Sequence, residues 1–355
     1  MSKDQILIRP LAMNSTINLS KGVTPLVQSR WEPLKGTWLK LEGCNPTGSF
    51  KDRIMGVLVD EAKLSGAKMA IVASSGNAAV SACSNAAKRG LMLVVIVPIS
   101  TPSETIYFLS RYPIFLIRYG GNPSDSHSLA KRMSLSLGVP NLSSTFSESG
   151  AEFGCRTIGH EISAQLPDQE IRTLAAAVSV GPVLIGARNG LLETGRKSPR
   201  LVAGQASGCS PIVRAFESGS EKVEAWSGAV ETAALSIADT LRNYEHEGAY
   251  FLQELRKSEG FMAAGNDSEL LHIKGMLREF DGIETEISCC AAIFALLRSG
   301  LEGESTVAVL TGSGIRQTVA DSFKKEALSP LGFQDRQYGN ESEQQICEEI
   351  SAWIS

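Results

Sequence analysis

Apolar runs alternate with helical segments along the first half of the chain. Residues 67–73 (AKMAIVA) and 91–98 (LMLVVIVP) are mostly apolar and have the length of strands buried on both faces. Between them, SSGN at 74–77 has the residues of a turn, and 78–89 (AAVSACSNAAKR) reads as a small-residue helix that Gly90 ends. This order predicts a strand–helix–strand unit with parallel strands.

The same alternation continues to the end of the chain. Helices are predicted at 103–112, 124–138, 152–162, 287–300 and within 337–355, and strands at 114–120, 173–181, 200–206 and 306–314. Alternating strands and helices predict an α/β protein with two domains, each an open, mostly parallel sheet flanked by helices.

Composition excludes several classes of protein. The chain has 355 residues, of which 43% are hydrophobic and 20% charged, as in an ordinary globular protein. A formal net charge of −4 gives no electrostatic footprint for nucleic acid. The longest apolar run, at 91–99, is far shorter than the roughly 20 residues that cross a bilayer, and the N-terminus lacks a signal-peptide core. We therefore expect a cytoplasmic protein with no membrane or nucleic-acid partner.

The cysteines and histidines do not predict a metal site or a disulfide framework. The seven cysteines contain no C-x-x-C pair, and the four histidines lie far apart in the sequence. An odd number of scattered cysteines is more typical of buried, reduced thiols.

Four turns carry the candidate chemistry. They lie at 44–51, 74–77, 179–186 and 311–316, where predicted strands or turn-forming runs lead into predicted helices. In open α/β sheets, ligands bind at the carboxyl ends of strands, where such turns present backbone N–H groups.

These turns, in this order, resemble those of the fold-type II pyridoxal-phosphate-dependent enzymes: threonine synthase, serine/threonine dehydratase, cysteine synthase and the tryptophan synthase β subunit. The resemblance extends from GVTPL (22–26) to TGSGIR (311–316) and is closest to threonine synthase-like members in LKLEGCNPTGSFKDR, RLVAGQASGCSPIVRAF and GIETEISCCAA. It implies pyridoxal 5'-phosphate as cofactor, a homodimer, a smaller mobile domain at 55–150, and a larger cofactor-binding domain formed by 1–54 and 151–355.

Lys51 ends the first turn and begins a predicted helix. The resemblance implies that Lys51 forms a Schiff base with the cofactor and later removes the substrate's α-proton. Because a free lysine has a pKa of about 10.4, the amine must be kept neutral, and the positive end of a helix disfavours the ammonium form. The alternative is a solvated surface lysine.

The second turn contains Ser74, Ser75, Gly76 and Asn77. By the resemblance, the first three present backbone N–H groups to the substrate carboxylate, and Asn77 binds the phenolic oxygen of the cofactor. An ordinary helix N-cap turn would use the same residue types.

Thr311, in the last turn, matches the family's partner for the pyridine nitrogen. A neutral hydroxyl does not hold that nitrogen protonated as an aspartate would, so this position favours elimination and replacement over transamination. Glu286 matches an acidic position near the ring. The alternatives are a plain strand-end turn and a solvated glutamate.

The third turn, SVGPVLIG, departs from the glycine-rich pattern of the family. The expected phosphate donors are the backbone N–H groups of Gly181, Val183, Leu184 and Ile185. Pro182 has no N–H, and the branched residues restrict the backbone, so the alternative is a weakened phosphate cup.

The residues that would bind the phosphate of a phosphorylated substrate are only partly present. Lys40 matches the family's phosphate-binding lysine, whereas Ala151 stands where an arginine is expected. Arg53 or Arg156 could substitute for that arginine.

Three functions are therefore predicted as competitors. The first is a lyase or synthase that eliminates or replaces a β or γ substituent of an amino acid. The second is a true threonine synthase acting on O-phosphohomoserine. The third is a non-catalytic binding protein that kept the fold.

Overall fold

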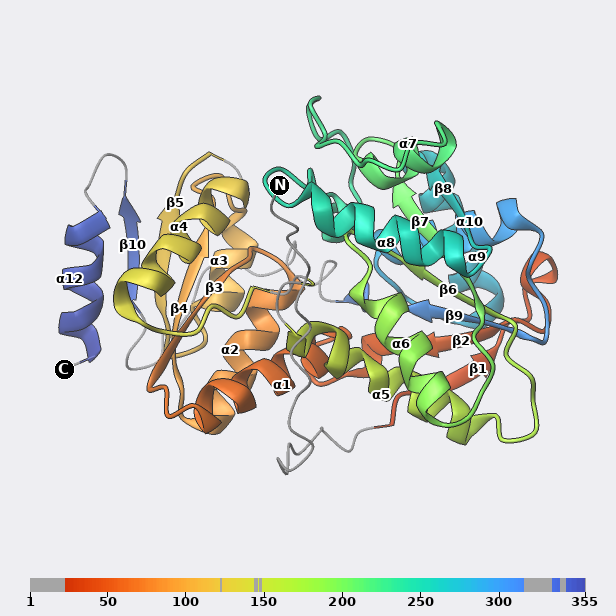
Figure 1. The fold of residues 1–355 in the computed structure, drawn as a ribbon, viewed down its shortest axis with the longest axis horizontal. Helices are drawn as coiled ribbons and strands as arrows, with labels where there is room; N and C mark the ends of the chain where they lie inside the picture. The colour runs from red at the N-terminus through yellow and green to blue at the C-terminus, as the bar shows by residue number, and fades with distance from the viewer. Residues whose placement is uncertain are drawn as a thin grey trace, which may run out of the picture. The chain divides into compact units, whose positions relative to one another are not determined.

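The structure is a computed structural model, and it describes residues 23–121, 123–143, 146, 149–315, 334–338 and 343–354. The chain folds into two compact units. The larger unit is formed by Met1–Phe50 and Thr145–Thr318, and the smaller unit by Lys51–Ser144 and Val319–Ser355. Figure 1 labels the helices and strands of both units.

The larger unit is built on a six-stranded sheet with the order β1-β2-β9-β6-β7-β8. Its strands are β1 (Leu26–Gln28), β2 (Trp38–Leu41), β6 (Thr173–Ala177), β7 (Arg200–Ala206), β8 (Phe261–Gly265) and β9 (Thr306–Leu310). Every neighbouring pair is parallel except β1 and β2. The carboxyl ends of the parallel strands therefore lie along one edge of the sheet.

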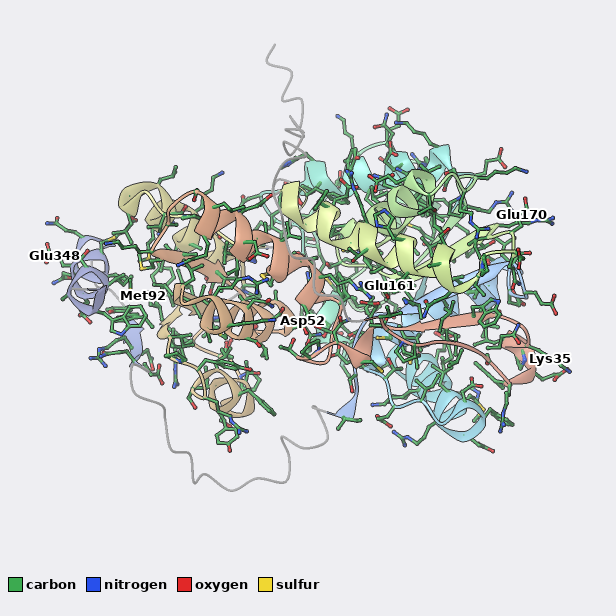
Figure 2. All side chains as sticks on the ribbon, turned by 90° about the horizontal axis from the view of Figure 1, so that it is seen from below. Lys35, Asp52, Met92, Glu161, Glu170 and Glu348 are labelled. Atoms are coloured by element: carbon green, nitrogen blue, oxygen red, sulfur yellow. The ribbon has the colours of Figure 1, made fainter. Side chains whose placement is uncertain are left out.

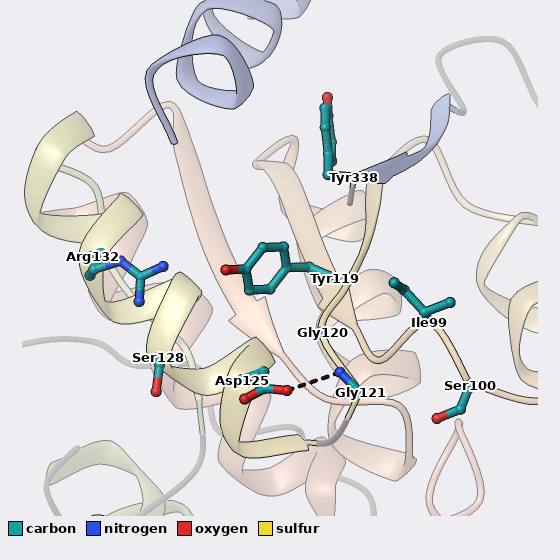
Figure 3. A pocket seen from close by; sticks show the side chains of 9 residues that line it. All are labelled: Ile99, Ser100, Tyr119, Gly120, Gly121, Asp125, Ser128, Arg132 and Tyr338. Atoms are coloured by element: carbon teal, nitrogen blue, oxygen red, sulfur yellow. Dashed lines mark hydrogen bonds between the residues drawn. The ribbon is translucent and has the colours of Figure 1, made fainter. Parts of the chain in front are cut away.

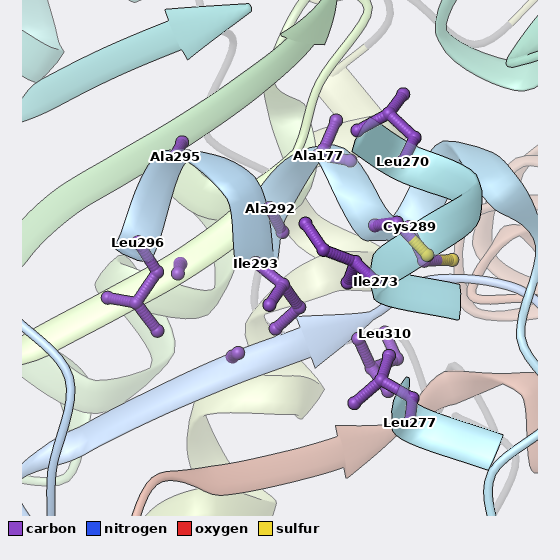
Figure 4. Close-up of a cluster of buried hydrophobic side chains, with 14 of the residues drawn as sticks. Ala177, Leu270, Ile273, Leu277, Cys289, Ala292, Ile293, Ala295, Leu296 and Leu310 are labelled. Carbon is purple, nitrogen blue, oxygen red and sulfur yellow. The ribbon is translucent and has the colours of Figure 1, made fainter. Parts of the chain in front are cut away.

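The helices of the larger unit are α5 (Ser149–Gln165), α6 (Pro182–Glu193), α7 (Pro211–Glu217), α8 (Glu245–Lys257), α9 (Asp267–Asp281) and α10 (Cys290–Ser299). Helices α9 and α10 cover one face of the sheet and enclose a core to which Leu39, Val202, Leu270 and Leu296 contribute (Figure 4). Small residues allow this close packing: a Cβ on Gly204 of β7 would overlap the backbone of α10.

The smaller unit contains a four-stranded, all-parallel sheet with the order β10-β5-β4-β3. Its strands are β3 (Met69–Ala73), β4 (Met92–Val97), β5 (Phe115–Tyr119) and β10 (Gln334–Tyr338), and its helices are α1 (Lys51–Leu64), α2 (Asn77–Arg89), α3 (Ser103–Leu109), α4 (Pro123–Leu137) and α12 (Glu343–Ile354). Leu129 and Met133 of α4 pack with Ile71, Ile96 and other strand residues in a core on one face. The predicted α/β class with open, mostly parallel sheets is confirmed.

Strand β10 and helix α12 belong to the smaller unit, whereas the sequence assigned residues 151–355 to the larger one. Strand β10 pairs in parallel with β5, from Gln334 opposite Phe115 to Tyr338 opposite Tyr119. Tyr338 and Ile350 join the apolar core of the smaller unit. Edge pairing and burial explain the placement, and neither leaves a local signal in the sequence. Figure 2 shows the side chains of both units.

No helix among the described residues is long and apolar enough to span a membrane.

Candidate functional site

The turn that precedes Lys51 is fastened to the turn that follows β9. The Phe50 N–H donates to the Thr311 carbonyl at 3.0 Å, and the Ser313 N–H donates to the Gly48 carbonyl at 2.8 Å. Gly48 has φ +86°, a conformation that other residues rarely adopt. These bonds lie within the larger unit and fix the position of Phe50, which is joined to Lys51 by one peptide bond.

The buried carboxylate of Glu42 stabilises the same turn through hydrogen bonds. Glu42 is fully buried and accepts hydrogen bonds from the Thr24 hydroxyl at 2.7 Å and from the Asn45 side-chain amide at 2.8 Å. The Asn45 amide also donates to the Glu42 carbonyl at 2.8 Å. The turn-forming run NPTGS is therefore held by a buried polar network rather than by local propensity alone.

Lys40 belongs to this network, and its surroundings give no support to a role in substrate binding. Its side chain is fully buried, and its ammonium group donates to the Thr24 carbonyl at 2.9 Å, the Glu161 carboxylate at 2.7 Å and the Gln165 side-chain carbonyl at 2.8 Å. An ammonium group has three N–H donors. All three have acceptors inside the protein, so Lys40 stabilises the fold around the turn.

A buried thiol, that of Cys289, lies beside the Thr311 turn, and no role for it was predicted from the sequence. The Cys289 sulfur lies 3.4 Å from the Thr311 hydroxyl, and it accepts from the Gly312 N–H at 3.2 Å. Burial, and after it the negative charge of Glu286, raises the pKa of the Cys289 thiol. The thiol therefore stays protonated and fixes the position of the Thr311 side chain.

Glu286 lies against the same turn. A Cβ on Gly312 would lie 2.8 Å from the Glu286 carboxyl carbon, so a larger residue at this position would have to displace the Glu286 carboxylate. Glu286 is buried, its N–H donates to the Gly312 carbonyl at 3.1 Å, and its carboxylate accepts from the Ser236 hydroxyl at 2.8 Å. The only signal for this arrangement in the sequence is the motif GIETEISCC, which contains both Glu286 and Cys289.

The turn between β6 and α6 has the geometry of an anion site. Gly181 is the N-cap of α6 with φ +113°, and Pro182 is the first helical residue. The Leu184 and Ile185 N–H groups donate to the Gly181 carbonyl at 3.1 and 3.3 Å. The N–H groups of Gly181 and Val183 have no acceptor among the described residues, although both residues are buried.

Buried, unused N–H groups at the positive end of a helix are suited to a phosphate. Proline at the first helical position removes an N–H that the helix itself would not use. Two further polar atoms, the Ser49 and Ser288 hydroxyls, are buried without a partner among the described residues. These groups could hold a phosphorylated, polar cofactor, with the N–H groups of Gly181 and Val183 as candidate phosphate donors and Thr311 as a candidate neutral hydroxyl.

In the smaller unit, the predicted SSGN turn joins β3 to α2. The Ser74 N–H donates to the Ile96 carbonyl at 3.2 Å, and the Gly76 N–H donates to the Ser74 hydroxyl at 3.2 Å. The Ser75 N–H has no acceptor among the described residues, which leaves it available to a ligand. Asn77 is the first residue of α2, next to the N-cap Gly76.

Lys51 is the first residue of α1 and is half-buried. The neighbouring Asp52 is buried, and its carboxylate accepts from the Ser81 hydroxyl of α2 at 2.5 Å. This bond links the starts of two helices that pack together in the smaller unit. Lys51 thus lies at a helix start, as the sequence predicted.

Comparison with known proteins identifies the family. The model of the pyridoxal-phosphate dependent enzyme family matches residues 17–312, so the chain belongs to that family. It is 28% identical over 313 residues to a threonine synthase of Bacillus sp. (strain ULM1), covering 84% of this chain and 85% of the relative. It is 25% identical over 321 residues to the threonine synthase of Methanocaldococcus jannaschii, covering 84% and 76% of the two chains.

Solved structures show the same fold at lower identity. An O-ureido-L-serine synthase superposes with a TM-score of 0.69 at 20% identity, covering 90% of this chain and 98% of the other. Threonine deaminase isoform 2 from Solanum lycopersicum gives a TM-score of 0.69 at 18% identity, covering 86% and 84% of the chains. The protein is thus a pyridoxal-phosphate-dependent enzyme with the fold-type II architecture, similar to threonine synthases.

Proposed function

We propose that the protein eliminates or replaces a β or γ substituent of an amino acid, with Lys51 as the catalytic residue. The observation that carries this proposal is the pair of hydrogen bonds that fastens the Gly48–Phe50 turn to the Thr311 turn. They fix the residue next to Lys51 relative to the hydroxyl that would face the cofactor ring.

The protein's own residues supply binding and proton transfer. When bound, pyridoxal phosphate supplies an aldehyde that condenses with amines and a ring that accepts electron density from the substrate's Cα. The Lys51 amine removes the proton from the substrate's Cα and can return it to another carbon of the substrate. The Thr311 hydroxyl, held by Cys289, would face the ring nitrogen as a neutral group, which would favour elimination or replacement over transamination.

Two sets of backbone N–H groups would hold the anionic parts of the ligands. Gly181 and Val183 would bind the cofactor phosphate, because their N–H groups are the unused donors of that turn. Ser75 would bind the substrate carboxylate for the same reason, with Asn77 on the phenolic oxygen of the cofactor. Leu184 and Ile185 contribute less, since their N–H groups already have an acceptor.

The second candidate is threonine synthase itself, favoured by the relatives that carry that name. The structure offers little to the phosphate of O-phosphohomoserine. Lys40 is fully engaged, and Arg156 is paired with Glu152 at 3.0 Å and with Glu193 at 2.7 Å. A small substrate without a phosphate therefore agrees better with these surroundings than a phosphorylated one.

The first experiment is the visible absorption spectrum of the purified chain with added pyridoxal phosphate. We expect a band of lysine-bound cofactor in the wild type and its loss in Lys51→Ala. Lys63→Ala is the matched control, because Lys63 is an exposed residue of the same helix. A band that survives in Lys51→Ala would reject the assignment, and no band in any variant would support a non-catalytic protein.

Turnover assays then distinguish an enzyme that acts on an unphosphorylated amino acid from a threonine synthase. L-Serine, L-threonine and O-phosphohomoserine are offered in turn, and keto acid, ammonia, phosphate and threonine are measured. Release of phosphate and threonine from O-phosphohomoserine alone would establish threonine synthase and rule out an unphosphorylated substrate. Keto acid from an unphosphorylated amino acid, abolished in Lys51→Ala, would support it.

A further inference from the structure

The smaller unit contains a pocket that is lined by none of the proposed catalytic, cofactor-binding or substrate-binding residues. Its volume is about 570 Å³, within the range of small-molecule sites. Figure 3 shows the walls: the segment after β4 with Ile99 and Ser100, the end of β5 with Tyr119, and α4 with Asp125 and Arg132. All of these residues belong to the smaller unit.

The pocket lies where the topology of the sheet favours a ligand. The chain runs β3, β4, β5 in one direction across the sheet. It then returns through α4, on the face covered by Leu129 and Met133, to Asn141, which bridges in parallel to Ile71 of β3. Right-handed connections place α3 and α4 on opposite faces, so the segments after β4 and β5 diverge. Such a switch point at the carboxyl ends of strands is the usual binding crevice of an open α/β sheet.

The rim of this pocket is preformed. The Ile99 N–H donates to the Gly120 carbonyl at 3.0 Å, which joins the segments after β4 and β5. The Gly121 N–H donates to the Asp125 carboxylate at 2.9 Å. Gly120 has φ +73°, and a Cβ there would overlap the Asp125 side chain. Asp125 is therefore held at the pocket wall by a backbone geometry that only glycine allows.

The pocket presents charges of both signs beside an apolar wall. Asp125 and Arg132 are two turns apart on α4, about 10.5 Å along the axis. The side chains of Asp125 and Arg132 both line the pocket (Figure 3). Arg132 binds the Glu343 carboxylate through Nε at 2.8 Å, and its side chain is 48% exposed. Ile99 and the Tyr119 ring supply the apolar surface.

We propose that this pocket binds the zwitterion of a free amino acid with an apolar side chain. Asp125 accepts from the ammonium group, the Arg132 guanidinium donates to the carboxylate, and the side chain lies against Ile99 and Tyr119. A simple anion would meet the Asp125 carboxylate, and a simple cation would meet the Arg132 guanidinium. A ligand that carries both charges satisfies both sides. The site is separate from the proposed catalytic residues.

Titration calorimetry of the full chain tests this, with L-isoleucine, L-methionine and L-phenylalanine as probes. We expect at least one to bind, and its analogue lacking the ammonium or the carboxylate to bind more weakly. For L-phenylalanine these analogues are 3-phenylpropionate and phenethylamine. No binding by any of the three amino acids, or equal binding of the singly charged analogues, would overturn the proposal.

Variants separate the pocket from its surroundings. Arg132→Gln and Asp125→Asn should each weaken binding by about tenfold or more, since each removes a charge-assisted hydrogen bond. Asn at 125 keeps an oxygen for the Gly121 N–H, so the rim is preserved. Glu343→Gln is the matched control: it removes the same ion pair but keeps the guanidinium, and binding should persist. If Glu343→Gln and Arg132→Gln lose affinity equally, Arg132 only tethers α12 and the proposal fails.

The proposal is independent of the catalytic assignment. Lys51→Ala should leave the binding of the probe unchanged, and Arg132→Gln should leave the visible band of bound pyridoxal phosphate unchanged. If Lys51→Ala abolishes binding of the probe, the amino acid occupies the proposed catalytic site and the pocket is not its site.

Discussion

Replacing Lys40 by methionine should destabilise the larger unit strongly. Methionine preserves much of the buried stem of lysine but removes the ammonium group. The side chain of Lys40 is 0% exposed and that of its partner Glu161 is 14% exposed. The change would remove one N–H donor each from the Glu161 carboxylate, the Gln165 side-chain carbonyl and the Thr24 carbonyl, of which the last keeps the Gln165 amide at 3.0 Å.

The magnitude follows from what remains of the network. Removing one partner of a buried ion pair costs about 3–5 kcal/mol. Glu161 still accepts from the Thr24 N–H at 3.1 Å, which offsets part of the loss. We therefore expect a loss near the lower bound, about 3 kcal/mol. For a unit of this size that lowers the melting temperature by about 6–12 °C.

The assay is thermal unfolding of the full chain followed by tryptophan fluorescence. Trp31, Trp38 and Trp226 lie in the larger unit, so the signal reports mainly on it. The matched control is Lys35→Met: Lys35 is 70% exposed, pairs with an exposed glutamate and lies at the surface in Figure 2. That change should cost no more than about 1 kcal/mol.

Two results would refute the reasoning. If Lys40→Met has the melting temperature of the wild type but loses affinity for a phosphorylated substrate, Lys40 binds the substrate, as the sequence suggested. If the losses of Lys40→Met and Glu161→Gln simply add in the double variant, the two groups do not interact. We expect the double variant to be more stable than the sum of the single changes predicts, because no unpaired charge remains buried.

Three other changes have definite expected outcomes. Gly181→Ala should cost about 2–4 kcal/mol by urea unfolding, from a strained φ and a steric overlap, whereas Gly195→Ala, with positive φ but open space, should cost only about 1–2 kcal/mol. Equal losses of stability in the two variants would show that steric overlap at Gly181 contributes nothing. Cys289→Ala should raise the Kd of pyridoxal phosphate about fivefold, because the Thr311 hydroxyl loses a partner; an unchanged Kd would reject that role. Burial raises the pKa of Cys209 to about 12, so the folded state keeps this proton after an unfolded thiol, with a pKa of about 8.5, has lost it. Its contribution to stability is complete below that pKa and is lost as pH rises toward about 12, so the wild type should lose more stability than Cys209→Ala between neutral and alkaline pH.

Local patterns were enough to predict two buried strands of the smaller unit and the helix between them. Residues 67–73 and 91–98 became β3 and β4 with buried side chains on both faces, and Gly90 ends α2 with φ +62°. These features depend on residues that are neighbours in sequence, namely an apolar run and a glycine after a helical segment. The SSGN turn was predicted for the same reason, because it begins where a buried strand ends.

Partners that are distant in sequence could not be read in this way. Lys40 binds Glu161 and Gln165, which lie on α5 more than a hundred residues later. A motif comparison places Lys40 beside a substrate, but it does not show which acceptors already use its protons. Cys289 is a similar case: its contact with Thr311 depends on how the segment before α10 meets the end of β9, and the motif alone gives no reason to single it out.

Pro182 shows how one structural position changes the meaning of a residue. In the sequence it looks like a lost phosphate donor, because the turn of the family is rich in glycine and N–H groups. In the structure it occupies the first position of α6, where proline costs a helix nothing. The donors that remain, Gly181 and Val183, are buried and flank it, so an anion there would be bound by fewer N–H groups at a fixed geometry. A phosphate bound at this turn, as proposed, would therefore have two principal N–H donors, which is why Gly181 rather than Pro182 should be the sensitive position.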